Sequence, residues 1–303
     1  MNDATATFTA LRPRLHGIAY RMLGSVAESE DLVQDIWLSW HGTDPSSIDN
    51  AEAWLVAATT RRAIDRLRSA RARREHYVGI WLPEPVLTDQ STTPEDLEEL
   101  ASDVSVAFLL LLERLAPEAR AAFLLREVFD TDYADIAGML DKSEAACRQL
   151  VHRAKAQLQD GRSPSTPTAR ERHPALMRRF ASALADGDIH AMREMLASDA
   201  VLMSDGGGKV NSFPEPMVGG MRIAQLFYAP HLRRSDNVRT ELAMVNGQWA
   251  VLRYFDDVLE SVQSYETDGK KIVAVHVQRN PDKLERFVHG TGGFRADGEV
   301  SPA

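Results

Sequence analysis

The sequence of 303 residues contains one cysteine, Cys147, which excludes an internal disulfide bond and fits a reducing cytoplasm. It lacks a run of about 18 apolar residues that could span a bilayer, and its N-terminus is not apolar enough for a signal peptide. It also lacks His and Cys clusters with metal-site spacing, nucleophile motifs and cofactor motifs. We therefore expect a cytoplasmic protein with no metal, no cofactor and no membrane partner.

Basic residues are in deficit, with 35 Lys and Arg against 44 Asp and Glu, but the deficit is uneven. A predicted helix over residues 51–75 carries most of the positive charge. Its seven arginines are Arg61, Arg62, Arg66, Arg68, Arg71, Arg73 and Arg74. Such a row would repel itself without an anion, so a polyphosphate partner is its natural counterion. The overall charge of −9 therefore does not exclude binding to nucleic acid.

The N-terminal segment predicts two helices, over residues 8–22 and from residue 27 to 40, separated by Gly24-Ser25. The second places acidic residues outward and ends in two tryptophans, Trp37 and Trp40. Aromatic residues beside charges are typical of a docking surface for a basic partner. A core tryptophan beside a solvated face is the alternative interpretation.

Residues 132–158 predict two short helices that meet at Asp141-Lys142-Ser143, the layout of a helix-turn-helix. We expect Ala146, Leu150, Ala154 and Leu158 to face inward, and Arg148, Gln149, His152, Arg153 and Lys155 to face outward. Ser143 can cap the second helix, and Asp132 with Asp135 can cap the first. Outward Arg, Gln and His side chains suit a DNA major groove, and a plain helical hairpin is the alternative.

Two linkers are predicted, a proline-containing segment over 77–97 and a second one near 160–174. The first contains Trp81-Leu82-Pro83, which is too apolar for an idle spacer. After the second linker, helices are predicted at 176–184, 189–196 and 221–228, and strands at 201–204, 239–245, 249–255, 258–265 and 272–278. Helices followed by a curved antiparallel sheet predict an α+β cone with a pocket.

The strings AYRMLGSVAESEDLVQDIWLSW (19–40) and AWLVAATTRRAIDRLRSARARR (53–74), followed by the helix-turn-helix, carry a family resemblance. They resemble regions 2 and 4 of bacterial RNA polymerase sigma factors of the extracytoplasmic function (ECF) type. The C-terminal third resembles the SnoaL-like branch of the NTF2-like fold, an extension found on one group of these factors. Its strings Asp205-Gly-Gly-Gly-Lys209 and Asn280-Pro-Asp-Lys-Leu284 also match that group.

This resemblance implies a multi-domain protein, with two all-α sigma domains and an α+β SnoaL/NTF2-like cone. The implied units are region 2 at 1–76, a linker at 77–97, region 4 at 98–160, a linker at 161–173, the SnoaL-like domain at 174–290 and a flexible tail at 291–303. The implied partners are RNA polymerase core, promoter DNA and, within the chain, contacts between the C-terminal domain and the sigma domains.

The resemblance also implies which residues meet each partner. Docking to core polymerase would use Glu28, Asp31, Gln34, Asp35 and Leu38. The −10 promoter element would meet Trp54, Arg61, Arg62, Asp65, Arg66 and Arg68. The −35 element would meet Ser143, Glu144, Arg148, Gln149, His152, Arg153 and Lys155. The regulatory interface would use Trp81, Leu82, Pro83, Asp205, Gly206, Gly207, Gly208, Lys209, Asn280, Pro281, Asp282, Lys283 and Leu284.

We therefore expect a sigma factor that initiates transcription under the control of its own C-terminal domain, rather than an enzyme. One alternative is that the cone is a sensor for an unknown small ligand, or an enzyme using Asp205, Tyr228, His231 or Asp256. These residues define no acid and base pair, and fold analogy alone cannot supply chemistry. A dimeric repressor using only the helix-turn-helix is a third hypothesis, and it predicts tight promoter binding without polymerase.

Overall fold

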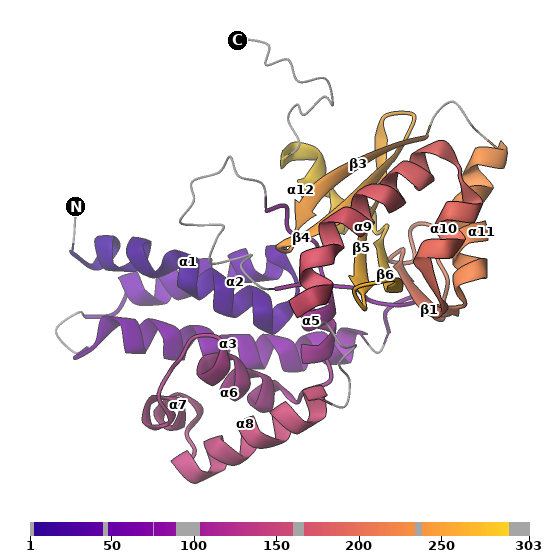
Figure 1. Ribbon diagram of the computed structural model, residues 1–303. Coiled ribbons are helices and arrows are strands. Elements are labelled where there is room, and N and C mark those ends of the chain that lie inside the picture. The colour runs from indigo at the N-terminus through magenta and orange to yellow at the C-terminus, as the bar shows by residue number, and fades with distance from the viewer. Residues whose placement is uncertain are drawn as a thin grey trace.

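The computed structural model describes residues 3–44, 48–74, 76–88, 104–159, 167–233 and 238–290. Helices form the N-terminal half, and a mixed sheet with further helices forms the C-terminal half (Figure 1). The first three helices are α1 (Asp3–Leu23), α2 (Val26–His41) and α3 (Ala51–Arg74). The predicted break at Gly24-Ser25 is confirmed. Gly24 has a φ of +68°, and the Ser25 side chain accepts the amide of Glu28 at 3.3 Å.

The two tryptophans of α2 belong to the helical packing rather than to a free docking face. Trp40 is 4% exposed, and its indole N–H donates to the carbonyl of Ala4 at 2.8 Å. Trp37 packs on Phe8, with 4.9 Å between the ring centroids. The core interpretation is therefore confirmed for Trp40, whereas Trp37 is half-buried beside Phe8. The exposed apolar residue of α2 is Leu38, at 63%.

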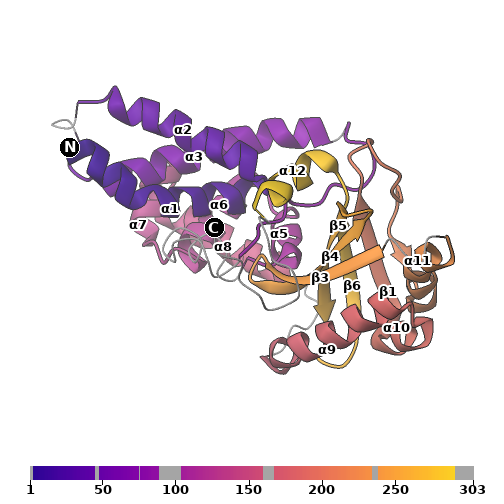
Figure 2. The ribbon, with the colours of Figure 1, turned by 90° about the horizontal axis from the view of Figure 1, so that it is seen from above.

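The second helical unit contains α5 (Val106–Leu112), α6 (Pro117–Glu127), α7 (Tyr133–Leu140) and α8 (Glu144–Gln159). It shares one hydrophobic core with α1–α3, in which Leu15, Leu32, Leu67, Leu112 and Leu124 are buried. Figure 2 shows these helices beside and beneath the first three. The part of region 4 before α5 is described only from residue 104, since 89–103 lie outside the described ranges.

Helices α7 and α8 confirm the predicted helix-turn-helix, with two local corrections. Ser143 caps α8 by accepting the amide of Ala146 at 3.2 Å, whereas the Asp132 side chain makes no capping bond to α7. The buried stripe of α8 is Cys147, Val151, Ala154 and Leu158. The stripe is therefore turned by one residue from the expected one, and Ala146 and Leu150 lie at its margin.

The C-terminal unit, called the tail domain below, begins with α9 (Pro167–Asp186) and α10 (Ile189–Met195). Helix α9 therefore occupies part of the range predicted as a second linker. The remaining elements are β1 (Leu196–Asp205), β2 (Met217–Val218), α11 (Gly220–Arg233), β3 (Val238–Val245), β4 (Gln248–Phe255), β5 (Val258–Thr267), β6 (Ile272–Gln278) and α12 (Pro281–Gly290).

The sheet has the order β2-β1-β6-β5-β4-β3. Strands β3 to β6 form the expected antiparallel meander, with turns at Asn246-Gly247 and Asp268-Gly269. Strand β1 pairs with β6 in parallel, so the expectation of a purely antiparallel sheet is wrong. Residue preferences indicate where strands occur. The pairing of β1 with β6 depends instead on the path of the chain, which enters the meander at β3 after α11 and reaches β1 only with its last strand.

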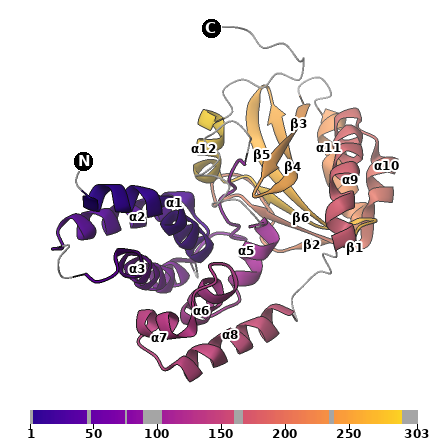
Figure 3. The same cartoon turned by 60° about the vertical axis from the view of Figure 1, so that its left-hand side comes forward.

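Each face of the sheet is covered differently. Helices α9, α10 and α11 lie on one side and α12 lies on the other (Figure 3). The first side, called the inner face below, holds a core that includes Phe180, Val251 and Tyr265. The other side holds a smaller cluster around Leu284, against which Leu87 of the first predicted linker packs. The sheet therefore contacts the linker through this second side, which we call the outer face.

Candidate functional sites

Helix α2 presents a stripe of predicted polymerase-binding residues. Asp31, Gln34 and Leu38 are exposed and lie three and four residues apart, which places them on one side of the helix. Glu28 and Asp35 are half-buried. Three of the five residues are thus open to a partner, and the other two lie where α2 meets α3.

Five arginines of α3, namely Arg61, Arg62, Arg66, Arg68 and Arg74, have partners among the described residues. Arg66 donates to the Asp35 carboxylate at 2.6 Å and to the carbonyl of Glu28 at 2.8 Å, while Arg62 lies 3.5 Å from Asp35. Two arginines of the row are thus already paired with one carboxylate of α2. The predicted polymerase-binding and DNA-binding residues are linked by these contacts.

Other α3 side chains contact the helix-turn-helix unit. The guanidinium of Arg61 donates to the carbonyls of Met139 at 2.8 Å and Gly138 at 2.9 Å, in the last turn of α7. A cation at a helix C-terminus is favourable, because the carbonyls there are partly negative. Arg68 is hydrogen-bonded to Asp65 at 3.1 Å and also binds Glu118 of α6. Trp54 is half-buried and packs on Trp40, with 5.5 Å between the ring centroids.

A buried carboxylate also joins the two helical units, in what we call the Glu113 contact. Arg120 is 1% exposed and donates to Glu113 at 2.8 Å and to the carbonyl of Met22 at 2.7 Å. Arg74 of α3 binds the other carboxylate oxygen of Glu113. Burial raises the pKa of Glu113, but Arg120 and Arg74 outweigh it and hold this pKa below its ordinary value.

The outward face of α8 is arranged as the sequence predicts. Its predicted −35 contacts are all exposed, namely Ser143, Glu144, Arg148, Gln149, His152, Arg153 and Lys155. Arg148 is paired with Glu144 at 2.8 Å and lies 4.8 Å from the ring centroid of Tyr133, while Lys155 is paired with Glu127 at 2.7 Å. This face can therefore approach DNA without rearrangement of α8 itself.

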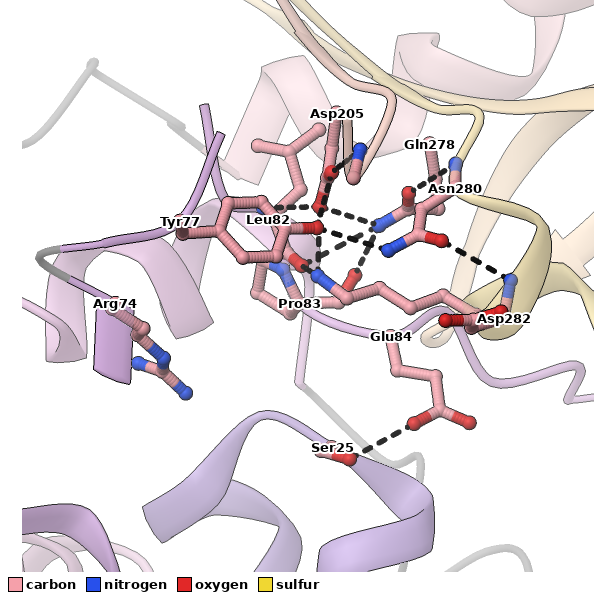
Figure 4. A network of polar contacts seen from close by, with 12 residues as sticks. Ser25, Arg74, Tyr77, Leu82, Pro83, Glu84, Asp205, Gln278, Asn280 and Asp282 are labelled. Atoms are coloured by element: carbon pink, nitrogen blue, oxygen red, sulfur yellow. Dashed lines mark hydrogen bonds and ion pairs between the residues drawn. The ribbon is translucent and has the colours of Figure 1, made fainter. Parts of the chain in front are cut away.

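The predicted regulatory interface converges on Asp205, at the end of β1 (Figure 4). Its buried carboxylate accepts the hydroxyl of Tyr77 at 2.7 Å and the amide of Leu82 at 2.9 Å. The ammonium of Lys283 lies 2.7 Å away, and the side-chain amide of Gln278 donates at 3.3 Å. We call these five residues the Asp205 cluster. It ties the linker to the start of α12 and to the end of β6.

The remaining residues of the two tail strings support this cluster. Asn280 donates to the Tyr77 hydroxyl at 2.9 Å and accepts the amide of Asp282 at 3.1 Å, which caps α12. Gly207 has a φ of +61°, and a Cβ there would lie 2.4 Å from Asn280. The glycine at this position thus permits close packing against Asn280. Lys209 pairs with Asp282 at 2.6 Å on the surface.

Burial changes the acidity of two members of the cluster. It lowers the pKa of Lys283, and Asp205 opposes that shift. It raises the pKa of Tyr77, whose hydrogen bond to Asp205 adds to the shift. Tyr77 therefore stays a neutral donor and Asp205 has one cationic partner, which makes the cluster sensitive to loss of the carboxylate charge.

Sequence reasoning missed several residues that hold the linker against region 2. Glu84 is 4% exposed, and its carboxylate accepts the amide of Val26 at 2.9 Å and the hydroxyl of Ser25 at 3.1 Å, at the start of α2. Its carbonyl accepts the hydroxyl of Tyr20 at 2.7 Å. Asn246 in turn donates to that hydroxyl at 2.8 Å. Glu84 lies between Pro83 and Pro85, and nothing in that sequence signals that it faces the start of a helix.

A pocket of about 200 Å³ opens where α2, α3, the linker and α12 meet. Trp81 lies on its wall between two cations, 3.5 Å from the Arg74 guanidinium and 4.5 Å from the Lys283 ammonium, measured to the ring centroid. Glu28 and Ser25 of α2 line the same pocket. The predicted polymerase-binding helix and the regulatory segment therefore share this wall.

The polar groups considered for an enzymatic tail are spread over the end of β1, α11 and the turn after β4. Asp205 is committed to its cluster, Tyr228 and His231 lie on α11, and Asp256 lies in the turn after β4. His231 bonds to the carbonyl of Leu184 at 2.7 Å. Within the described ranges, no group of three or more His, Cys, Asp or Glu residues could hold a metal ion. No helix in those ranges is long and apolar enough to cross a bilayer.

The two helical units and their opposed acidic and basic faces define a sigma-type transcription initiation factor. The Sigma-70 region 2 family model matches residues 7–73, and the Sigma-70 region 4 family model matches residues 105–158. The chain is 34% identical to the ECF RNA polymerase sigma factor SigJ of Mycobacterium tuberculosis, over 95% of this chain and 97% of SigJ. This chain therefore belongs to the ECF sigma factors.

Two further comparisons extend over all three units. The chain is 29% identical to the probable ECF sigma factor SigI of M. tuberculosis, over 96% of this chain and 98% of SigI. The crystal structure of M. tuberculosis SigJ matches with a TM-score of 0.73 and 29% identity, covering 93% of this chain and 98% of that one. The C-terminal unit has the expected α+β architecture. As a sigma factor, the protein binds RNA polymerase core and promoter DNA and directs transcription initiation.

Proposed function

We propose that the tail domain controls this sigma factor in cis by clamping residues 77–88, the linker segment, onto region 2. The observation that supports the clamp is the Asp205 cluster. One carboxylate of the tail domain accepts a side-chain and a backbone donor from the linker segment, at 2.7 and 2.9 Å. The tail strand β3 adds a second attachment, because the amide of Thr88 donates to the carbonyl of Met244 at 2.8 Å.

The clamp sets how far apart the two promoter-reading units can move. If released and extended, the linker segment would add up to about 40 Å of reach, at about 3.3 Å per residue. When the linker segment is held against the tail domain, its contribution to the distance between the two units is fixed. Because one base pair advances the duplex by about 3.4 Å, the clamp restricts which spacings between −10 and −35 elements the protein accepts.

In the same proposal, the described arrangement is the resting state of the free protein. Arg61, which we assign to −10 binding together with Trp54, Arg62, Asp65, Arg66 and Arg68, binds the end of α7 instead of DNA. Polymerase would bind the exposed stripe of α2 and separate the two units. The outward face of α8 would then read the −35 element.

We infer further that the tail domain acts as a regulator and not as a catalyst. The candidate acid Asp205 is wholly buried against the linker, where no substrate can meet it. Its role in the clamp accounts for that burial.

The test is transcription by core polymerase with the full-length protein, on promoters whose spacer differs by single base pairs. Asp205→Asn keeps the shape of the side chain and removes its charge, so it should release the linker and broaden the range of spacers used. Asp282→Asn is the matched control, because it removes the same charge from a surface pair with Lys209. It should leave the spacer preference unchanged.

Hydrogen exchange at the Leu82 amide reports separately whether the clamp has opened. A D205N protein with a fast-exchanging Leu82 amide and an unchanged spacer preference would refute control through the linker. Activity as a sigma factor would be unaffected by that refutation.

A further inference from the structure

A buried arginine of the tail domain, Arg253, forms no ion pair with the described residues. Arg253 on β4 is 7% exposed and lies opposite Thr240 of β3 and Ser261 of β5. Its guanidinium lies 4.9 Å from the ring centroid of Phe255. No hydrogen bond or ion pair joins this guanidinium to another residue in the described ranges. Burial lowers the pKa of Arg253, and the Glu260 carboxylate only partly opposes that shift.

The carboxylate that Arg253 senses most strongly is already occupied. Glu260 lies 2.6 Å from the Nε atom of Arg279, and it accepts the hydroxyl of Ser261 at 2.7 Å. Arg279 adds its own positive charge to this part of the sheet and disfavours a second cation. Arg253 therefore forms no ion pair with any described residue.

The polar side chains beside Arg253 satisfy one another. The hydroxyl of Tyr265 donates to the carbonyl oxygen of the Gln263 side chain at 2.5 Å. The amide nitrogen of Gln263 then donates to the Ser261 hydroxyl at 3.1 Å. These hydrogen bonds join Tyr265, Gln263 and Ser261 to one another, and none of them is directed at Arg253. The missing group is an acceptor, and a negatively charged acceptor suits a guanidinium best.

The surroundings of Arg253 also restrict what kind of anion fits. Arg253 and Val251 are two residues apart on one strand and share the inner face of the sheet, which α9–α11 cover. Leu242, opposite Val251, packs against the same core. A ligand there would meet one charged group and an apolar wall, which matches a carboxylate carried on a small apolar body.

We propose that Arg253 anchors a binding site for a small organic anion on the inner face of the tail sheet. A guanidinium can hold a carboxylate through two parallel hydrogen bonds. The anion would neutralise a charge that is otherwise buried without a partner, an arrangement that proteins rarely tolerate. This site is separate from the Asp205 cluster, so its existence does not depend on the proposed clamp.

The test is thermal unfolding of the full-length protein with acetate, benzoate or inorganic phosphate, at an ionic strength held constant with sodium chloride. At least one of these anions should raise the unfolding midpoint by several degrees in a saturable way. Arg253→Gln should abolish that shift. Without anion, Arg253→Gln should unfold at the wild-type temperature or above, because it removes an uncompensated buried charge.

Arg239→Gln is the control for the change in net charge. Arg239 lies on β3 of the same sheet and is 43% exposed, and its own carboxylate partners are Glu241 and Asp257. The R239Q protein should keep the full anion shift. If Arg253→Gln does not fold, Arg253→Lys keeps the charge but loses the bidentate geometry, and it should show a smaller shift than wild type. A wild-type protein that none of the three anions stabilises more than its Arg253 variant overturns the proposal.

Discussion

Two buried carboxylates hold this molecule together, and their surroundings differ. Asp205 joins the linker to the tail domain and is fully buried, with one cation and several neutral donors around it. Glu113 joins the two helical units, is 21% exposed at its side chain and meets two arginines, Arg74 and Arg120. The Asp205 carboxylate itself is closed off from solvent, although Tyr77 and Lys283 of its cluster also line the pocket beside Trp81. The Glu113 contact is the more buried end of the interface between the two helical units. That interface becomes more exposed toward the helix-turn-helix.

This difference indicates which parts of the molecule can separate. Beyond Glu113, region 2 meets the second unit through Arg61 and Arg68, whose side chains are exposed. Exposed ion pairs contribute little and weaken in salt, whereas breaking one partner of a buried pair is costly. We therefore expect the helix-turn-helix end of the contact to open first, while the Asp205 cluster stays closed.

The largest expected effect comes from removing the charge at the Asp205 cluster. Asp205→Asn leaves the Lys283 ammonium buried without its carboxylate, and losing one partner of such a pair costs about 3 kcal/mol or more. The Leu82 amide should then exchange with solvent roughly a hundredfold faster, measured by native-state hydrogen exchange. Asp282→Asn, at a surface pair, should change this rate little. Equal protection in D205N and wild type would mean that the two contacts do not differ as argued.

As the pH falls, we expect the tail domain and the Glu113 contact to lose stability at different pH values. Burial lowers the pKa of His276 to about 4, and this residue lies on the same strand face as Gln278 of the Asp205 cluster. An unfolded histidine has a pKa of about 6.5, so the unfolded chain binds the extra proton between these values. The stability of the tail domain should thus be complete above pH 6.5 and fall by about 3 kcal/mol as the pH drops to 4.

The contact at Glu113 should respond later. Its pKa is held low by Arg120 and Arg74, so its contribution is complete above the ordinary carboxyl pKa and is lost only as the pH falls through the lowered value. Urea unfolding of the wild-type and His276→Gln proteins between pH 4 and 7 measures how much His276 contributes to the pH dependence of the free energy of unfolding. Glu266 lies 3.5 Å from His276, and burial raises its pKa, so it is the neighbour to compare in a second variant. Parallel pH curves for wild type and H276Q would contradict this assignment.

The sequence could predict features that recur along an element. Helix boundaries, the strands of the meander and the exposed face of α8 follow from periodicity, caps and turn residues, as at Ser143 and Asn246-Gly247. The two tail strings could be assigned to an interface, because a family resemblance accompanied them. What each of their residues does there stayed open, since Tyr77, Leu82, Gln278 and Lys283 each lie more than 70 residues from Asp205 along the chain.

Features that depend on one partner in space could not be predicted. Tyr77 and Glu84 are single residues in a proline-containing segment, and nothing in their neighbours signals that Asp205 and the start of α2 face them. The same holds for the buried side of α8. Ala146 and Leu150 form as good an apolar stripe as Cys147 and Val151, and packing against α6 selects the second. The parallel pairing of β1 with β6 is likewise a tertiary choice.

The smallest expected effect tests the exposed end of the contact between the helical units. Glu118→Gln removes the α6 partner of Arg68, whose side chain is 55% exposed, and should weaken the closed arrangement by about 0.5 kcal/mol. Raising the salt from 0.1 to 1 M shortens the screening length from about 10 to 3 Å and should act in the same direction. Both changes should increase the radius of gyration measured by X-ray scattering. Neither should alter exchange at the Leu82 amide.

Glu144→Gln is the control, because its pair with Arg148 lies within α8 and does not bridge the units. If salt and E118Q exposed the Leu82 amide as readily as they expanded the molecule, the two contacts would open together. The tail domain would then release the linker whenever the promoter-reading units separate, and the clamp could not set their spacing.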